Sequence, residues 1–131
     1  MMKHPVTVLK SLYGIYQVGY DAQVEAPFTR DGFFSFTKDN DEVTVICTQH
    51  NAVETGVIKS ELNWKILKVT GPLDFNITGI IAGITSVLAD NAIPVFVVST
   101  YSTDIIMVRE HHIEKAANGL REAGYSVTFE E

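Results

Sequence analysis

The sequence predicts an α+β protein on the ferredoxin-like βαββαβ plan, arranged as two tandem units of which the N-terminal one is abbreviated. Two observations lead to this prediction. Residues 64–130 alternate between strand-like and helix-like hydrophobic patterns in the order βαββαβ, and residues 6–50 repeat part of that order without clear helices. A chain of 131 residues has room for one substantial core or for two half-size units, so both units are expected to be small.

The second half of the chain opens with an expected strand at residues 64–70, where Trp64 and several aliphatic residues precede a Gly-Pro stop. A helix is expected next, at about residues 77–91, because apolar side chains recur at the spacing of one helix face. This face consists of Ile77, Ile80, Ile81, Ile84, Val87 and Leu88. Asn76 or Thr78 can cap the start of the helix with a side-chain oxygen.

Two strands, a helix and a last strand follow. Val95–Ser99 and Ile105–Val108 are apolar runs separated by a polar turn, which is the pattern of a hairpin. A second amphipathic helix then stops at Gly124. Its apolar face consists of Ile113, Ala116, Ala117 and Leu120. The alternating residues Tyr125–Glu130 complete the order, which predicts a four-stranded antiparallel sheet with both helices on one face.

The first half matches the second at an apparent offset of 62 residues. Two strands and a trailing histidine correspond, namely Phe34–Thr37 to Phe96–Ser99, Val43–Ile46 to Ile105–Val108, and His50 to His112. Internal duplication with one degenerate copy is the simplest account of this match.

The abbreviated unit is expected to begin with a strand at about residues 6–13, closed by Gly14. The connection over residues 15–32 contains two glycines and a proline and shows no helical stripe, so a strand extension and a short turn are expected in place of the first helix. The expected domain division is residues 1–62 for the abbreviated unit and 63–131 for the complete one.

The net charge of −6 comes from 16 acidic and 10 basic residues, and the basic residues are scattered along the chain. Nucleic acids are recognised through a concentrated basic face, so no nucleic-acid partner is expected. No apolar stretch is long enough to span a bilayer and the N-terminus lacks the apolar core of a secretion signal, so a cytoplasmic protein away from membranes is expected. The single cysteine, Cys47, lies in an apolar run and is expected to be a small buried hydrophobic residue.

The sequence contains no arrangement typical of a catalytic, cofactor or metal site. It has no Ser-His-Asp or Cys-His pattern and no glycine-rich phosphate loop. His111 and His112 are adjacent, so on a helix they point in different directions, and no third ligand follows at a useful spacing. These two and His50 are expected to be solvated side chains. Neither a metal, a cofactor nor enzymatic activity is expected.

Three segments of the second half resemble a known family, and they do so in the family's order: Gly71–Ile80, Ile93–Phe96 and Ser99–Asp104. Together they are similar to the small tandem ACT-domain proteins, relatives of the CASTOR-type arginine sensors and of the regulatory region of aspartate kinases. The resemblance is strong over residues 64–125 and weakens toward the N-terminus. It implies that the complete unit is an ACT domain and that the abbreviated one is a degenerate ACT-like unit.

The resemblance implies a regulatory sensor module and no enzyme. Units of this family bind a free amino acid or a similar small effector where units meet side by side, so a homodimer and a regulated protein partner are expected. Two other functions remain open from the residues alone. One is a structural protein-interaction domain with a vestigial ligand pocket, and the other is a small enzyme with Asp104 or a histidine as general base. The identity of the amino acid is not predicted.

The same resemblance places the ligand-binding residues in the loop after the first strand and in the turn after the second. The residues of the loop are Asp74, Phe75, Asn76, Ile77, Thr78 and Gly79. Those of the turn are Ser99, Thr100, Tyr101 and Asp104. The loop ends at a helix N-terminus, whose backbone N–H groups suit the α-carboxylate of an amino acid. Asp104 can accept a hydrogen bond from an ammonium or guanidinium group.

Each of these residues also has a purely structural interpretation. Asn76 or Thr78 can simply cap the helix, and Gly79 can simply pack against the sheet. Asp104 can be a turn aspartate that bonds its own backbone, which is common in such stretches. Tyr101 either stacks on a ligand or covers the edge of the sheet.

Overall fold

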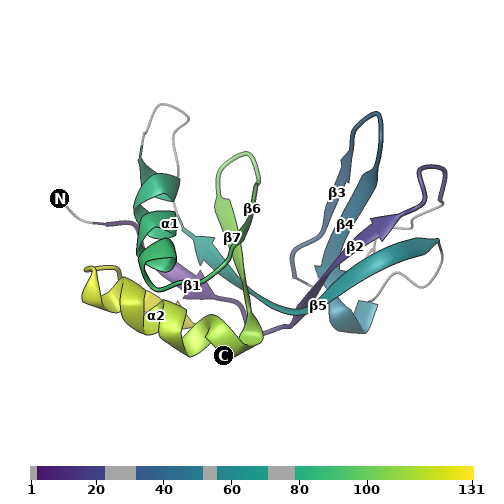
Figure 1. The fold of residues 1–131 in the computed structure, drawn as a ribbon. Coiled ribbons are helices and arrows are strands. Elements are labelled where there is room, and N and C mark those ends of the chain that lie inside the picture. The colour runs from purple at the N-terminus through teal and green to yellow at the C-terminus, as the bar shows by residue number, and fades with distance from the viewer. Residues whose placement is uncertain (1–2, 23–31, 52–55, 71–78) are drawn as a thin grey trace. The chain divides into compact units, whose positions relative to one another are not determined.

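The protein is represented by a computed structural model that describes residues 3–22, 32–51, 56–70 and 79–131. The chain forms two compact units (Figure 1), which we call unit 1 (Met1–Lys10 and Lys65–Glu131) and unit 2 (Ser11–Trp64). The first ten residues therefore group with the second half of the chain, whereas the division at residue 62 expected them in the N-terminal unit.

Unit 1 contains the complete βαββαβ order that the sequence predicts. Its elements are β1 (Val6–Val8), the last part of β5 (Val57–Val69), α1 (Ile80–Asp90), β6 (Phe96–Ser99), β7 (Asp104–Arg109), the 3₁₀ helix η2 (Glu110–His112), α2 (Ile113–Glu122) and β8 (Val127–Phe129). Its strands are neighbours in the order β6-β7-β5-β1-β8. Without β1, this is the strand order of a ferredoxin-like fold, so the predicted α+β class is confirmed.

The strand expected at residues 6–13 is wrong, because the structure divides this segment between two strands in different units. β1 pairs antiparallel with β5 and parallel with β8, inside unit 1. The next strand, β2 (Tyr13–Val18), belongs to unit 2. Alternation of apolar residues identifies a strand but not the sheet that receives it, and the buried side chains of Val6 and Val8 fit the core of unit 1.

Unit 2 has the same strand plan without α-helices in its described residues. It consists of β2, β3 (Ser35–Lys38), β4 (Val43–Thr48), the 3₁₀ helix η1 (Gln49–Asn51) and residues 57–64 of β5. The strands are neighbours in the order β3-β4-β2-β5, and each of these pairs is antiparallel. The predicted abbreviation is confirmed for the part that the structure describes, because residues 19–22 and 32–34 carry no helix.

The two units repeat at an offset of 61 residues, so the expected offset of 62 is wrong by one. β3 and β6 start at residues 35 and 96, β4 and β7 at 43 and 104, and η1 and η2 at 49 and 110, with equal lengths in each pair. The error arose because apolar runs align almost equally well after a shift of one residue, although such a shift exchanges the two faces of a strand. His50 therefore corresponds to His111, and not to His112.

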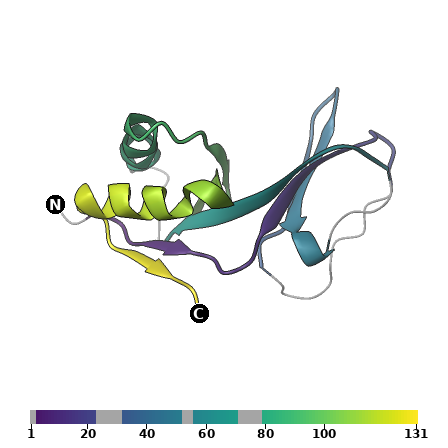
Figure 2. The same ribbon diagram turned by 60° about the horizontal axis from the view of Figure 1, so that its bottom comes forward.

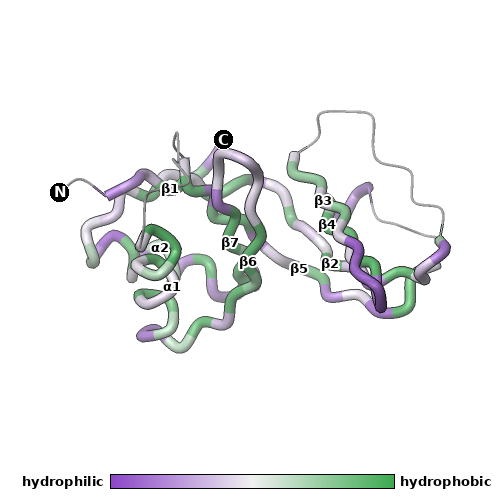
Figure 3. Tube along the Cα trace, turned by 90° about the horizontal axis from the view of Figure 1, so that it is seen from above, coloured by the Kyte–Doolittle hydropathy of each residue, from purple (hydrophilic) through white to green (hydrophobic). Residues whose placement is uncertain are grey.

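The core of unit 1 lies between its strands and its two helices, and Figure 2 shows both helices on the same face of these strands. α1 contributes Ile84 and Leu88, and the apolar stripe of α2 is buried as its periodicity predicts. β6 and β7 are apolar along much of their length (Figure 3). Neither α1 nor α2, nor any other helix in the described residues, is long and apolar enough to cross a membrane.

The core of unit 2 lies on the equivalent face of its sheet. Its buried members are Tyr16, Val18, Val43, Val45 and Cys47, with Ala22, Phe34 and Val57 packed against them. At the offset of 61, Val45 and Cys47 correspond to Ile106 and Val108 of unit 1, which face the helices there. Cys47 is buried as expected, and its thiol donates a hydrogen bond to the Asn51 carbonyl at 3.6 Å.

Candidate functional site

Two of the segments expected to form the site lie at the same end of unit 1. β6 and β7 are antiparallel and are joined by a turn over residues 100–103, and Figure 1 shows the N-terminal end of α1 at the same end of the unit as this turn. The described site residues are Gly79, Ser99, Thr100, Tyr101 and Asp104. Five others lie outside the described residues, namely Asp74, Phe75, Asn76, Ile77 and Thr78.

Gly79 is the N-cap residue of α1 and adopts a left-handed conformation, with φ 81° and ψ 0°. Its carbonyl accepts the hydrogen bond of the Gly83 N–H at 2.9 Å. A Cβ added at Gly79 would meet no described atom within 4 Å, so the alternative interpretation, in which this glycine packs against the sheet, is wrong. The glycine is needed for its backbone conformation, which a residue with a Cβ adopts at a cost.

The first turn of α1 offers an environment that favours an anion. The N–H groups at a helix start have no intrahelical acceptor, and the helix dipole places partial positive charge there. The first turn carries no acidic side chain, and Gly79 supplies no side-chain cap. Asn76 and Thr78, the caps expected from the sequence, precede the described part of this helix.

The turn between β6 and β7 is closed by side-chain hydrogen bonds at two levels. Ser99 and Asp104 face each other in the hairpin register, and the Ser99 hydroxyl donates to Asp104 Oδ1 at 2.6 Å. One step further out, the Thr100 N–H donates to the Thr103 carbonyl at 2.9 Å. The Thr103 N–H donates to Thr100 Oγ1 at 3.1 Å, and the two threonine hydroxyls are hydrogen-bonded to each other.

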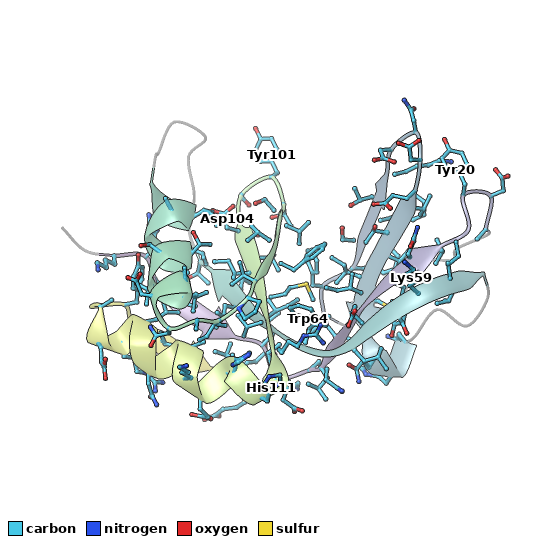
Figure 4. All side chains as sticks on the ribbon, in the orientation of Figure 1. Tyr20, Lys59, Trp64, Tyr101, Asp104 and His111 are labelled. Atoms are coloured by element: carbon cyan, nitrogen blue, oxygen red, sulfur yellow. The ribbon has the colours of Figure 1, made fainter. Side chains whose placement is uncertain are left out.

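The Asp104 carboxylate is therefore held in position by the Ser99 hydroxyl and not by the backbone of the turn. Its side chain is partly exposed, at the start of β7 (Figure 4). A turn aspartate that bonds its own backbone would accept from the N–H groups that follow it. In this hairpin the turn-closing contacts are made by Thr100 and Thr103, and Asp104 accepts a hydrogen bond from the Ser99 hydroxyl across the hairpin.

Tyr101 lies at the tip of the same hairpin, and Figure 4 shows its side chain directed outward from the tip. With 82% of its surface exposed, Tyr101 does not cover the sheet edge, so that interpretation is wrong. Thr103 closes the turn but is missing from the residues expected at the site. The signal was present, because threonine hydroxyls commonly bond the backbone of a turn.

The histidines at the start of α2 lie away from this turn in the fold. The rings of His111 and His112 are 4.1 Å apart between centroids and are tilted by 42°. Desolvation lowers the pKa of His112 from its ordinary value, and the nearby His111, Lys115 and Arg109 lower it further. In the part of the chain that the structure describes, no group of three or more His, Cys, Asp or Glu side chains could hold a metal ion.

Comparisons with known proteins agree with this architecture. The family model of the ACT domain matches residues 59–122. A structural-genomics protein from Agrobacterium tumefaciens is 31% identical, with a TM-score of 0.87 over 100% of this chain and 96% of its own. No curated protein sequence matches the chain significantly.

Two solved structures of aspartate kinases share the fold at low sequence identity. The regulatory subunit of the Thermus thermophilus enzyme, in its ligand-free form, is 9% identical with a TM-score of 0.64, over 94% of this chain and 99% of its own. The Clostridium acetobutylicum aspartate kinase is 12% identical with a TM-score of 0.66, and the match covers 90% of this chain but 34% of the kinase. The family match over residues 59–122, together with the fold shared with the aspartate kinase structures, shows that this chain is an ACT-domain protein.

Proposed function

We propose that this protein is a regulatory module that binds a free amino acid or a similar small effector at one end of unit 1 and catalyses no reaction. The observation that carries the proposal is the Ser99–Asp104 hydrogen bond of 2.6 Å, which holds a carboxylate at the end of unit 1 where α1 begins. A carboxylate and a helix N-terminus at the same end of a unit provide opposite charges for the two charged groups of an amino acid.

The chemistry of the proposed complex follows from those two groups. The α-carboxylate is expected at the N–H groups around Gly79 and the first turn of α1, where the helix dipole is favourable. The α-ammonium group, or the cationic end of a basic side chain, is expected at Asp104, where it forms a charge-assisted hydrogen bond. Thr100 and Tyr101 lie in the turn that precedes Asp104, and we include them in the proposed site.

The preceding loop completes the site in this proposal. Asp74, Phe75, Asn76, Ile77 and Thr78 stay predictions that rest on the family resemblance. Asn76 and Thr78 are included because their side chains are polar. The cytoplasmic location and a regulated protein partner, both expected from the sequence, stay part of the same proposal.

A thermal-denaturation screen of the full chain against each of the twenty free amino acids tests this function. A ligand present at 100 times its dissociation constant stabilises the folded state by about 2.7 kcal/mol, which shifts the melting temperature by several degrees. Stabilisation by one amino acid or by a chemically related group of them is the expected result. A flat response to all twenty at millimolar concentration would contradict the proposed function.

A second candidate is a structural interaction domain with a vestigial pocket, and the outer edge of β6 favours it. β6 pairs with β7 alone among the described strands, and it leaves Phe96 and Val97 exposed at 38% and 40%. Exposed apolar edges pair with other chains unless charges protect them, and β6 contains no charged residue. We therefore propose a homodimer under either function, with β6 as its pairing edge.

Analytical sedimentation tests the homodimer and the role of β6 as its pairing edge. A Val97→Lys variant places a charge on this edge and is expected to shift the dimer toward monomer, while Thr37→Lys on the exposed strand β3 is the matched control. A protein that is dimeric but binds no amino acid would favour the interaction domain. A wild-type protein that is monomeric at micromolar concentrations would contradict the homodimer.

A further inference from the structure

We infer that each chain has one effector site, in unit 1, and that the equivalent hairpin of unit 2 has lost the chemistry for a second one. This inference rests on the proposed function and adds its stoichiometry and its location. A duplicated protein would otherwise be expected to carry two equivalent sites, one for each copy of the hairpin. The offset of 61 residues makes it possible to compare the two hairpins position by position.

The two hairpins are equivalent in their backbone geometry. β3 and β6 have 4 residues each, and β4 and β7 have 6 each. The registers also agree, because Lys38 pairs with Val43 in unit 2 as Ser99 pairs with Asp104 in unit 1. Lys38 is therefore the counterpart of Ser99, and Val43 is the counterpart of Asp104.

Val43 removes the acceptor on which the proposed site depends. Its side chain is 1% exposed and packs in the core of unit 2 with Tyr16 and Val18. An aliphatic side chain offers no hydrogen bond to an ammonium group. Because the position is part of a core in unit 2 and only partly buried in unit 1, the same backbone position has a packing role in one copy and a polar role in the other.

Lys38 places a positive charge at the position where unit 1 has the neutral Ser99 hydroxyl. Its ammonium group lies 4.0 Å from the centroid of the Tyr20 ring, a cation–π contact within unit 2. A lysine there repels the ammonium group that the proposed site of unit 1 attracts. Figure 4 labels Tyr20 in unit 2 and Asp104 in unit 1.

Of the three carboxylates in the unit 2 turn, those of Asp39, Asp41 and Glu42, the first is used by the turn itself. Asp39 Oδ1 accepts hydrogen bonds from the N–H groups of Asp41 at 2.7 Å and of Glu42 at 2.8 Å. Asp39 is thus a turn aspartate that bonds the backbone of its own turn, whereas Asp104 is not. The described residues between β2 and β3, 19–22 and 32–34, also carry no helix whose N-terminus could receive a carboxylate.

Calorimetric titration of the full chain with each of the twenty free amino acids, one at a time, tests the inference. Every amino acid that binds is expected to saturate at one equivalent per chain. Asp104→Asn is expected to weaken that binding at least tenfold, whereas Lys38→Ser in unit 2 is expected to change it less than twofold.

The possible outcomes distinguish failure of this inference from failure of the proposed function on which it rests. Saturation at two equivalents, at half an equivalent, or a tenfold loss on Lys38→Ser would overturn the single site in unit 1 while leaving amino-acid binding intact. Absence of binding by all twenty amino acids would overturn the proposed function, and the inference with it. Folding of both variants is checked by their melting temperatures, and Asp104→Ala, which also removes the charge, replaces Asp104→Asn if the latter fails to fold.

Discussion

The ammonium group of Lys3 lies 4.6 Å from the centroid of the Tyr125 ring and donates a hydrogen bond to the Ala123 carbonyl, at the C-terminal end of α2. The start of the chain is thereby attached to the second helix of unit 1. A cation at a helix C-terminus is favoured by the dipole, and the aromatic face adds a second attraction.

Replacement of Lys3 by Met keeps the aliphatic stem and removes the charge. We expect the free energy of unfolding to fall by about 0.5–2 kcal/mol, from the lost helix-end and cation–π interactions. Lys10→Met is the matched control, because Lys10 is an exposed lysine of the same unit. Urea denaturation compares the two variants, and equal effects would contradict a specific role for Lys3.

Gly32 combines a left-handed backbone with a close neighbour. Its φ is 77°, and an added Cβ would overlap the hydroxyl of Tyr13, which accepts a hydrogen bond from the Phe33 N–H at 3.1 Å. Gly79 has a similar φ of 81° but open space around its Cβ position. We expect Gly79→Ala to cost about 1–2 kcal/mol of stability from backbone strain alone, and Gly32→Ala to cost more.

A double-mutant comparison isolates the overlap at Gly32. In a Tyr13→Phe background the hydroxyl is gone, so the penalty of Gly32→Ala is expected to fall toward that of Gly79→Ala. Chemical denaturation of the four proteins gives the coupling energy. A penalty for Gly32→Ala that does not change in the Tyr13→Phe background would show that the hydroxyl contact does not limit this position.

Ala92 adopts a left-handed conformation just after α1, with φ 58°, where glycine is the preferred residue. The Ile93 N–H donates to the Leu88 carbonyl at 2.9 Å, which closes the end of the helix. We expect Ala92→Gly to raise stability by about 0.5–1 kcal/mol, since the strain removed exceeds the added flexibility of the unfolded chain. Ala89→Gly, inside the helix, is expected to lower stability by about 0.5–1 kcal/mol. A stability change of the same sign in both variants would contradict the left-handed conformation of Ala92.

Asp39 gives a pH dependence whose sign follows from its hydrogen bonds. The N–H groups of Asp41 and then of Glu42 hold the pKa of the Asp39 carboxyl below its ordinary value of 3.8. A carboxyl whose pKa is lower in the folded state adds stability above its unfolded pKa, and this contribution disappears as the pH falls through the folded pKa. Asp39→Ala is therefore expected to destabilise more at pH 7 than at acidic pH, in denaturation curves recorded at pH 7 and at decreasing pH values. An equal loss at pH 7 and at acidic pH would contradict this account.

The sequence predicts unit 1 more completely than unit 2 for a physical reason. The apolar stripe of α2 is long enough for its period to identify the helix, and α2 buries the face that this period specifies. β7 is recognisable in the sequence as a continuous apolar run, and its four apolar residues are all buried. β1 could not be assigned to its sheet, because three alternating residues fit either unit and the choice depends on pairing with β5 and β8. The predicted repeat offset was wrong by one residue for a similar reason, because apolar runs align almost equally well after a shift of one residue.

The candidate site shows the same limit. Polar residues near Asp104 could be selected from the sequence, but the hydrogen-bond partner of each could not, because it depends on the hairpin register. That register pairs Ser99 with Asp104 and leaves turn closure to Thr100 and Thr103. The alternative interpretation of Gly79 as a packing residue could not be rejected from the sequence, because the positive φ of a glycine cannot be read from its neighbours in the chain.

The central claim is that the Asp104 carboxylate binds the cationic group of an amino acid, and two conservative variants separate this role from hairpin structure. Asp104→Asn keeps an oxygen acceptor for Ser99 but removes the charge, whereas Ser99→Ala removes the 2.6 Å hydrogen bond but keeps the charge. The most direct measurement is calorimetric titration of wild type and both variants with the amino acid that stabilises the wild type in the thermal screen. The account predicts that Asp104→Asn loses about 1.5–3 kcal/mol of binding free energy, which is a tenfold to hundredfold loss of affinity, and that Ser99→Ala loses less. Unchanged affinity in Asp104→Asn would contradict the account, and would assign Asp104 to the hairpin alone.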